Sequence, residues 1–521
     1  MVHRSLGIAR LVVFGDSLSD NGNLFRLLGF PPPPYWRGHF SNGPNYAEDL
    51  ANWLHVPLDD RAYGGADASN TFTPLPINLP NQVAGYVAHL KGHAPRPGTT
   101  ALINIGSNDY ETLLSNLPHD PATITAFIAD VVHSISQAID ALTKAGVGKI
   151  ILFTLPDLAI TPDVRSLGPA LVAAAHELVS LNNAALAEMA ASHLNVETVD
   201  VFTLGDAIAA DPKSFGFYAP SHVTWLHELR SHSTKFAPNE VAFFDHLHPT
   251  GAAHGVLAAF AEAVLSARTV RFLDGTQTVI HAGPGDSFIF ATAIDRTEVG
   301  FSDDYTIHGG RGNDVIFAGS GDVTVYGGRG NDLIAAGDGN AFLRGGVGAD
   351  LLETSSHGVN TLIAGEGEDV LIANRAGRNR LVGGRGDDLF ILKESLVASH
   401  GHLAFGRQEI AGGSGENTLR FIINDQHPQA MSALEAEFLE IKSAFDLAVW
   451  GGHAGRFTVD GLHVRDIDRI ELQVDSVSTD PNTPYLITHR IVLADGAAPV
   501  PLPAGVNHLL ATAEHWNLLT A

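Results

Sequence analysis

The sequence contains no cysteine, few methionines and few positive charges for its length. Without cysteine, the 521-residue chain has no disulfide bond, no thiolate nucleophile and no cysteine-ligated zinc site. Its 31 Lys and Arg stand against 57 Asp and Glu, a formal net charge of -26. This charge argues against nucleic acid as a partner, because phosphate binding depends on clustered positive side chains. Divalent cations are partners better suited to this negative charge.

Long apolar runs are also missing from the sequence. None approaches the roughly 18 residues that could span a bilayer, so we predict no transmembrane segment. The apolar stretch 11–14 is short and has no cleavage signature, and we interpret it as a first buried strand rather than a signal peptide. The length of 521 residues and a hydrophobic fraction of 45% predict a globular protein of two or three domains.

From residue 1 to about 265, short apolar runs alternate with longer helical patterns, which is typical of a parallel sheet covered by helices. The predicted strands are 11–14, 101–105, 149–153 and 196–201, with a weaker strand before Ala62. The predicted helices are 46–54, 83–90, 124–144, 171–193 and 252–267. In an open α/β sheet, ligands bind at the carboxyl ends of the strands.

Residues suited to acyl transfer follow these strands in order. Ser17 comes directly after the first strand, where main-chain N–H groups at a helix start favour negative charge. Gly65 allows the backbone to approach a reacting carbon, and Asn108 offers a side-chain amide to an oxyanion. Asp245 and His248 supply a general base and the carboxylate that orients it.

Each of these signals is weak alone, because a serine after Asp16 is more often an ordinary turn or helix cap. The Asp-x-x-His pair also occurs at 130/133, within a helical pattern, and at 460/463, beyond the repeats described below. Only the pair 245/248 stands in a loop just before a predicted helix near the end of the same domain. The order of the whole set therefore favours a serine hydrolase.

This order resembles the GDSL, or SGNH, hydrolase family over roughly residues 8–265. The resemblance implies a flavodoxin-like three-layer α/β/α fold with a five-stranded parallel sheet. It also implies catalytic roles for Ser17, Asp245 and His248, and an oxyanion hole formed by Ser17, Gly65 and Asn108. Gly64 is an alternative to Gly65 in this match.

The segments 14–23 and 40–44 look like the branch of that family that contains secreted phospholipases, haemolysins and lipase-like esterases. This similarity implies carboxylic esters of acyl chains as substrates without choosing among them. The loop 31–36 is rich in proline and aromatic residues, and it is either a border of an acyl pocket or an exposed connection stiffened by proline. No histidine cluster has zinc-like spacing, so we expect no catalytic metal.

A nine-residue period begins near residue 282, with the clearest units at 309–317, 327–335, 345–353, 364–372 and 383–391. Glycines in these units permit tight turns that expose carbonyl groups, and the aspartates add carboxylates, so both provide hard oxygen ligands for calcium. The predicted calcium residues are Asp314, Asp332, Asp350, Asp369 and Asp388 with Gly312, Gly330, Gly348, Gly367 and Gly386. The apolar residue two positions after each aspartate should point the same way.

Weaker units lie between the strong ones and carry Val323, Ala341, Asn360 and Asn379 at the aspartate position. We therefore expect calcium along one edge of the repeat domain, with asparagines satisfying the other edge. A flexible glycine-rich linker is the structural alternative, but linkers lack this period. The units resemble RTX repeats, which implies a parallel β-roll, several structural calcium ions and export by a bacterial type I machinery that reads an uncleaved C-terminal signal.

The predicted domains are a hydrolase domain at 1–265, a linker at 266–281, an RTX calcium-binding β-roll at 282–391 and a C-terminal mixed or β region with the secretion signal at 392–521. The leading hypothesis is a secreted extracellular ester hydrolase. One alternative is a phospholipase or haemolysin that acts on membrane lipids. Another is a calcium-dependent surface or adhesion module with a vestigial hydrolase domain.

Overall fold

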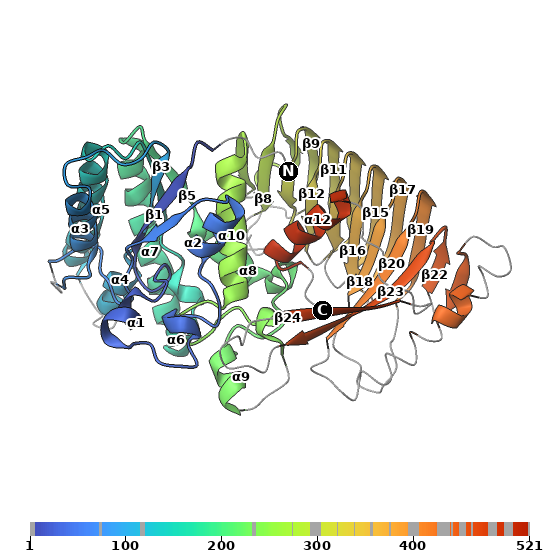
Figure 1. The fold of residues 1–521 in the computed structure, drawn as a ribbon, viewed down its shortest axis with the longest axis horizontal. Helices are drawn as coiled ribbons and strands as arrows, with labels where there is room; N and C mark the ends of the chain where they lie inside the picture. The colour runs from blue at the N-terminus through green and yellow to red at the C-terminus, as the bar shows by residue number, and fades with distance from the viewer. Residues whose placement is uncertain are drawn as a thin grey trace.

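The computed structural model describes residues 6–518 apart from 72–74, 115–119, 232–235, 274, 292–303, 320, 338, 355–357, 375–376, 394–405, 425–437, 439–440, 447–454, 460–461, 478–486 and 494–503. An α/β domain and a β-roll lie side by side, and the roll extends away from the α/β domain as a stack of parallel turns (Figure 1).

The N-terminal domain is built on a five-stranded parallel sheet in the order β2-β1-β3-β4-β5. Its strands are β1 (Arg10–Gly15), β2 (Leu58–Asp60), β3 (Thr99–Asn104), β4 (Lys149–Phe153) and β5 (Val196–Val199). This sheet confirms the predicted α/β class.

Helices cover both faces of the sheet, because the strands are apolar at consecutive positions. In β1, Leu11 and Val13 join a core with α2 (Tyr46–Trp53), α8 (Val201–Ala210) and α10 (Gly251–Ser266). Val12 and Phe14 face the opposite layer. That layer contains α3 (Leu79–His89), α5 (Pro121–Lys144) and α7 (Pro169–Ala191). Strands buried on both faces are expected in parallel sheets.

Short elements at the rim of the domain complete it. They are α1 (Asn23–Leu28), η1 (Trp36–Gly38), α4 (Ser107–Leu114), η2 (Leu158–Ile160), α6 (Pro162–Ser166), η3 (Pro212–Phe215), α9 (Trp225–Ser231) and η4 (Pro238–Glu240). By length and composition alone, α5 and α7 are apolar enough to cross a membrane. Their apolar side chains, such as Phe127 and Leu178, pack in the core against the sheet.

The roll consists of two facing sheets whose strands alternate along the chain. One sheet contains β6 (Thr269–Leu273), β8 (Ser287–Ala291), β10 (Val315–Phe317), β12 (Leu333–Ala336), β14 (Leu351–Thr354), β16 (Val370–Asn374), β18 (Leu389–Lys393), β20 (Thr418–Asn424), β23 (Arg469–Val477) and β24 (Ile487–Leu493). The other contains β7 (Val279–His281), β9 (Thr306–Arg311), β11 (Val323–Arg329), β13 (Ala341–Val347), β15 (Val359–Glu366), β17 (Arg378–Arg385), β19 (Gln408–Ser414), β21 (Phe457–Val459) and β22 (Leu462–Arg465).

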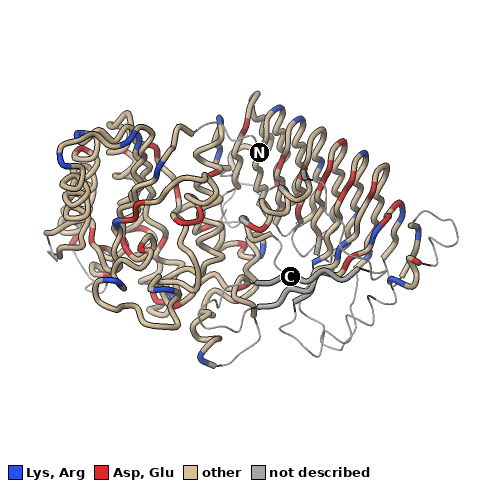
Figure 2. Tube along the Cα trace, viewed as in Figure 1, with Lys and Arg blue, Asp and Glu red and all other residues tan. Residues whose placement is uncertain are grey.

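The repeat period sets the register of the roll. Ile316 pairs with Ile334 and Ile334 pairs with Leu352, so one turn takes 18 residues at these positions. These apolar side chains are fully buried between the two sheets, together with Leu343 and Leu362 of the opposite sheet. Acidic residues recur from one turn to the next (Figure 2).

The structure places the ends of the roll differently from the domain boundaries that the sequence predicts. Residues 266–281, expected as a linker, contain β6 and β7, which pair with β8 and β9. Beyond residue 391, β19, β20, β22 and β23 continue the two sheets. The prediction followed the strong glycine-rich units, whereas β6, β7, β22 and β23 join the roll by main-chain pairing without that motif.

A large apolar junction joins the two parts. Phe215, after α8, stacks on Phe317 of β10 at 5.7 Å between ring centroids, and Phe260 of α10 meets Phe290 of β8 at 5.4 Å. The C-terminal helix α12 (Ala504–His515) and Trp516 fill the remaining space, with the Trp516 ring 4.4 Å from that of Phe317. Strands such as β8, β10, β12 and β14 in this sheet are therefore buried on both faces.

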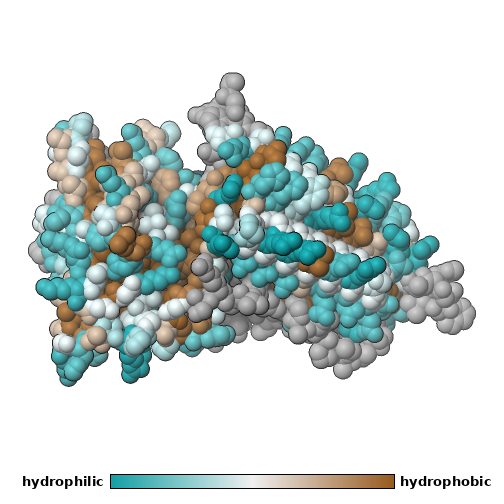
Figure 3. Space-filling view, turned by 90° about the horizontal axis from the view of Figure 1, so that it is seen from above, coloured by the Kyte–Doolittle hydropathy of each residue, from teal (hydrophilic) through white to brown (hydrophobic). Residues whose placement is uncertain are grey.

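Polar contacts fix this junction as well. The Asn517 amide donates to the carbonyl groups of Phe215 and Asn239, both at 2.9 Å. The buried ammonium of Lys393 lies 3.1 Å from Glu353 and donates to the Leu518 carbonyl at 2.8 Å. Seen from above, hydrophilic side chains cover most of the roll, while hydrophobic ones gather over the N-terminal domain and its seam with the roll (Figure 3).

Candidate active site and calcium-binding repeats

Three distant segments meet at the carboxyl edge of the five-stranded sheet. Ser17 follows β1, Asn108 is the second residue of α4 after β3, and His248 lies just before α10. The Nε2 atom of His248 is 2.9 Å from the Ser17 Oγ, and its Nδ1 atom is 2.9 Å from Asp245 Oδ2. A carboxylate only accepts hydrogen bonds, so Nδ1 carries the proton and Nε2 accepts from the Ser17 hydroxyl. The structure thus brings the three predicted catalytic residues into one chain of hydrogen bonds.

Asp245 is held as a carboxylate. Burial alone would raise its pKa, but the hydrogen bond and charge of His248, with the N–H groups of Leu247 and His248, together lower the pKa to about 2. The side chains of Asp245 and His248 are each only 12% exposed. The carboxylate therefore orients the imidazole across the whole physiological pH range.

Tyr35 contacts the triad, which the sequence did not predict. Its hydroxyl donates to Asp245 Oδ2 at 2.9 Å, and its ring packs on Phe244 at 4.9 Å. Burial and the Asp245 charge raise the Tyr35 pKa, so the hydroxyl remains a donor. The proline-rich loop 31–36 therefore holds the Asp245 carboxylate in position through Tyr35. With 210 positions between the two residues, no local pattern signals their contact.

Potential oxyanion donors converge beside Ser17. The Asn108 amide donates one N–H to the Ala66 carbonyl at 2.8 Å, which fixes the side chain and leaves its second N–H available. Among the described residues, no acceptor bonds to the main-chain N–H of Ser17 or Gly65. Gly65 has a φ of +75°, a conformation that favours glycine. These groups match the requirement for donors aimed at a developing oxyanion.

The structure distinguishes Gly64 from Gly65. The Gly64 N–H donates to Asp20 Oδ2 at 2.8 Å, and a Cβ atom there would collide with the Phe40 ring. Gly65 is exposed, with open space where a Cβ would stand. The geometry therefore favours Gly65 as the donor and gives Gly64 a packing role.

An apolar cavity of about 150 Å³ opens beside the triad. Ser17, Asn108 and His248 stand on its wall, and most of its other lining is aliphatic or aromatic. The apolar side chains include Leu158, Ile160, Leu204, Ile208, Phe217 and Leu257. Such a lining suits an acyl chain whose carbonyl carbon is presented to Ser17.

The second Asp-x-x-His pair has a different environment. Asp130, on α5, accepts the Ser69 hydroxyl at 2.7 Å and the Thr71 hydroxyl at 3.0 Å. His133 lies instead beside the exposed Gln137 at 2.9 Å. Of the third pair, Asp460 lies outside the described residues.

Three potential metal ligands do lie together near the cavity. One oxygen or nitrogen atom from each of Asp157, His176 and Asp206 falls within 4.8 Å of the others. The His176 Nδ1 is 2.8 Å from Asp157 Oδ2, and the hydrogen bond between Asp157 and Asp206 belongs to the same group. Asp157 caps the start of η2, whereas His176 lies on α7 and Asp206 on α8, so sequence spacing did not signal this cluster.

The strong repeats place their aspartates in a buried ladder along one edge of the roll. The N–H of Asp314 donates to Asp332 Oδ1 at 2.9 Å, and that of Asp332 donates to Asp350 Oδ1 at 2.9 Å. The same contact continues through the last two strong units. In all five residues, Oδ2 is buried without a hydrogen-bond partner among the described residues: Asp314, Asp332, Asp350, Asp369 and Asp388.

This column of unpartnered oxygens suits a hard cation such as calcium. With no cation, burial raises the pKa of Asp314 to about 6 and that of Asp332 and Asp369 to about 7. Burial together with neighbouring aspartates raises the pKa of Asp388 to about 8 and of Asp350 to about 9. A bound divalent cation would compensate the carboxylate charges.

The glycines predicted with these aspartates stack on one another. Gly312, Gly330, Gly348, Gly367 and Gly386 all have φ between 120° and 148°. A Cβ atom on Gly330 would collide with the Gly312 carbonyl oxygen, and the same holds along the column. Glycine is thus required for the close stacking of the turns, which brings main-chain carbonyl groups to the edge that carries the aspartates.

Along the opposite edge of the roll, the buried hydrogen bonds join mainly uncharged side chains. The Asn360 amide donates to Asn379 Oδ1 at 2.9 Å, and the Asn379 amide donates to Gln408 Oε1 at 3.0 Å. Asp322 is exposed here and accepts from Asn340 at 3.0 Å. The two edges therefore differ as the weak repeat units indicate.

Comparisons with known proteins match both parts of the chain. The GDSL-like Lipase/Acylhydrolase family matches residues 11–260, and the RTX calcium-binding nonapeptide repeat matches 308–343, 324–352 and 357–390. The thermolabile hemolysin of Vibrio parahaemolyticus is 28% identical over 272 residues, covering 48% of this chain and 62% of the relative. The phosphatidylcholine-sterol acyltransferase of Aeromonas hydrophila is 29% identical over 311 residues, covering 54% and 90%.

Other matches are shorter or more distant. The secreted effector protein SseJ of Salmonella typhimurium is 31% identical over 173 residues, covering 30% of this chain and 38% of the effector. A solved lipolytic protein of the G-D-S-L family from Veillonella parvula is 14% identical, with a TM-score of 0.28 and coverage of 48% of this chain and 95% of its own. The chain therefore contains a GDSL-like lipase/acylhydrolase domain at residues 11–260 and RTX calcium-binding nonapeptide repeats within residues 308–390.

Proposed function

We propose that the protein is a secreted serine ester hydrolase that cleaves acyl esters through an acyl-enzyme intermediate on Ser17. The observation that supports this most directly is the chain of hydrogen bonds from Asp245 through His248 to the Ser17 hydroxyl. The free donors of Ser17, Gly65 and Asn108 on the same side complete the requirements for acyl transfer.

In the first half of the reaction, Ser17 Oγ attacks the ester carbonyl carbon while its proton passes to His248 Nε2. The carbonyl oxygen becomes an oxyanion and accepts hydrogen bonds from the Ser17 and Gly65 N–H groups and the Asn108 amide. When the intermediate collapses, the bond to the alcohol oxygen breaks and His248 returns the proton to that oxygen. Asp245 stabilises the imidazolium between these steps.

In the second half, a water molecule loses a proton to His248 Nε2 and attacks the acyl carbon. The acid leaves, and Ser17 Oγ recovers its proton. An alcohol in place of water would give acyl transfer instead of hydrolysis. The apolar cavity accommodates the acyl chain.

A membrane lipid is the second candidate substrate. The aliphatic lining of the cavity and the names of two relatives, a hemolysin and a phosphatidylcholine-sterol acyltransferase, favour it. Release of fatty acid from phosphatidylcholine would separate a phospholipase from a hydrolase of short soluble esters.

Calcium would be held by the aspartate ladder and would supply charge compensation for folding of the roll. Phe217 lines the cavity, and Phe215, two residues earlier, stacks on Phe317 of the roll. A folded roll therefore supports one wall of the proposed acyl pocket. The RTX resemblance further suggests type I export before calcium folds the chain outside the cell.

A panel of ester substrates tests this proposal on wild type and Ser17→Ala, with and without calcium. Wild type should cleave acyl esters, and Ser17→Ala should lose nearly all turnover. Ser192→Ala, at the distant end of α7, is the matched control and should keep full activity. Full activity in Ser17→Ala would refute the assignment, and no turnover in wild type would favour an adhesion module.

A further inference from the structure

Four exposed apolar side chains cluster on α1 and the residue shortly after it. Phe25 is 38% exposed, Leu27 is 59%, Leu28 is 70% and Phe30 is 52%. We call these residues the apolar rim. Isolated exposed leucines are ordinary, but four apolar side chains within six positions form a patch of the kind that marks an interaction surface.

The apolar rim is continuous with the candidate active site. The Phe30 ring lies 5.9 Å from that of Phe40, and the Phe40 ring lies 5.0 Å from the imidazole of His248. A single buried aromatic residue therefore separates the rim from the proposed general base. Figure 1 shows α1 at the edge of the domain where α4 and α6 also lie, beyond the carboxyl ends of the strands.

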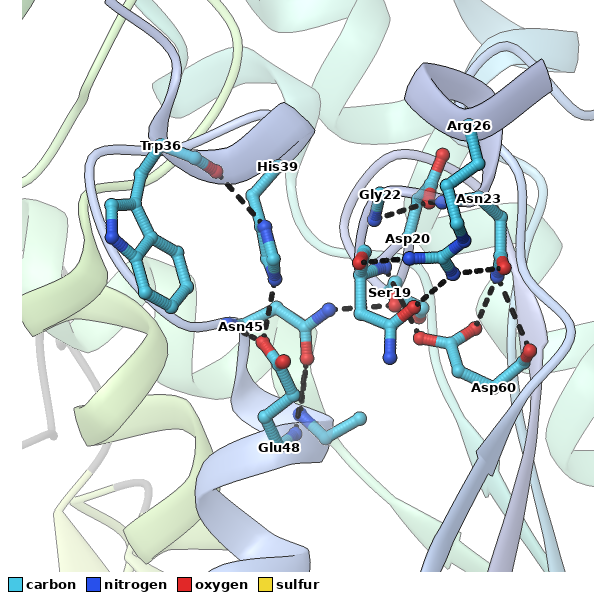
Figure 4. Close-up of polar contacts among 12 residues, drawn as sticks. Ser19, Asp20, Gly22, Asn23, Arg26, Trp36, His39, Asn45, Glu48 and Asp60 are labelled. Atoms are coloured by element: carbon cyan, nitrogen blue, oxygen red, sulfur yellow. Dashed lines mark hydrogen bonds and ion pairs between the residues drawn. The ribbon is translucent and has the colours of Figure 1, made fainter. Parts of the chain in front are cut away.

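Hydrogen bonds hold the start of α1, the helix that carries most of the apolar rim, in place (Figure 4). The Asp20 carboxylate accepts the N–H groups of Gly22, Asn23 and Leu24 at the start of α1. The Asn23 amide donates to the Ala62 carbonyl at 2.9 Å, which ties the helix to the chain after β2. The apolar side chains are thus presented by a fixed backbone.

The same segment differs in charge from the rest of the protein. Residues 21–47 contain two arginines and no aspartate or glutamate, although the whole chain has a net charge of -26. Arg26 donates to amide and carbonyl oxygens of Asn21 and Asn23, and Arg37 lies over the Trp36 ring at 4.8 Å. Among the described residues, no carboxylate forms an ion pair with either guanidinium.

We propose that the apolar rim docks the protein on a phospholipid bilayer, with its four apolar side chains among the acyl chains and Arg26 and Arg37 at the level of the lipid phosphates. This surface would place lipid esters at the mouth of the Ser17 site, so the inference rests on the proposed ester hydrolysis. Arginine and phosphate are complementary in charge and hydrogen bonding. A twofold-symmetric contact between two copies of the chain would instead bring the arginines of one copy close to those of the other.

Vesicle binding tests the proposal. The full chain with Ser17→Ala, in calcium, is sedimented with phosphatidylcholine vesicles, so that binding is measured without hydrolysis. Leu27→Gln/Leu28→Gln in this background should weaken binding at least about tenfold, because two apolar side chains no longer enter the bilayer. The matched control is Leu181→Gln/Leu194→Gln, on α7 and before β5, two leucines outside the apolar rim that are 51% and 105% exposed. This control should bind as its parent does.

In the background that retains Ser17, the rim variant should hydrolyse a soluble short-chain ester at the parent rate. The proposal would be overturned if the rim variant and the control bound vesicles equally. It would also be overturned if the rim variant lost soluble-ester turnover to the same extent as vesicle binding. A dimer in the absence of vesicles that the rim variant abolishes would also overturn it, because the rim would then bind a second copy. Soluble-ester activity independent of Ser17 would refute the proposed hydrolysis without affecting the vesicle measurement.

Discussion

His248 Nε2 lies 2.9 Å from the hydroxyl of Ser17, a residue 231 positions earlier in the chain. The contact exists because β1 and the loop before α10 both end at the carboxyl edge of the sheet. Asp245 and Tyr35 align the imidazole from the other side.

Asn108→Ala should lower kcat roughly a hundred- to a thousandfold, because it removes a donor from the proposed oxyanion hole. Substrate affinity should change less, since the lost hydrogen bond forms mainly in the transition state. Steady-state kinetics with a soluble ester measure both effects. Asn81→Ala, an exposed amide on α3, is the control. Equal kinetics for the two variants would remove Asn108 from the oxyanion hole.

Asp245→Asn should lower kcat by about three to four orders of magnitude, because an amide does not enforce the Nδ1–H tautomer of His248. The pKa of about 2 means that Asp245 itself does not titrate above pH 4, so wild-type activity should not follow its protonation there. Asp130→Asn, in the second Asp-x-x-His pair, should leave kcat unchanged. A pH–rate profile on both variants checks this, and similar losses in both would contradict the assignment.

Removal of calcium should make the stability of the roll dependent on pH. In the cation-free folded state, burial raises the pKa of the ladder aspartates to between about 6 and about 9, whereas an unfolded aspartate titrates near roughly 3.9. The folded state then binds more protons than the unfolded state, so stability falls as pH rises from about 4 to 9.

Thermal unfolding in chelator should therefore show a lower Tm at pH 8 than at pH 5. With calcium bound, the carboxylates stay ionised in both conditions and the difference between the two pH values should shrink. A calcium-free Tm that rises with pH would contradict the ladder as the calcium site.

Trp516→Ala should cost roughly 3–5 kcal/mol of unfolding free energy, because it leaves a cavity between the roll and the N-terminal domain. Trp516 is 3% exposed and contacts Phe317. Tyr326→Ala, on the outer face of the other sheet, should cost much less. Denaturant unfolding monitored by circular dichroism measures both, and equal losses would contradict a tightly packed junction.

Local patterns predicted most of the long elements of the N-terminal domain closely. The strand predicted at 196–201 instead ends at Val199, and α8, which begins at Val201, was not predicted. The strand at 149–153 appears as Lys149–Phe153, and the helix predicted to end at Lys144 does end there. Apolar runs and turn residues specify such elements directly. The contact of Tyr35 with Asp245 and the clustering of His176 with two aspartates depend on how distant segments pack, so sequence periodicity does not signal them.

The sequence also contains an indication of the junction between the two parts, which the nine-residue period alone does not reveal. Strong units such as Val315, Ile316 and Phe317 are apolar at three consecutive positions, which indicates a strand buried on both faces. In β11, apolar Val323 and Val325 alternate with half-buried Thr324 and Tyr326, as expected for a strand with one outer face. Which partner covers the second face depends on tertiary packing.

Covalent labelling of the nucleophile tests the central claim most directly. A fluorophosphonate that modifies activated serines should add one group per chain in calcium, and peptide mass spectrometry should place it on Ser17. Ser17→Ala should take up none at the same concentration, and Asn108→Ala should be labelled more slowly. Labelling at another serine, or equal labelling of Ser17→Ala, would contradict the account.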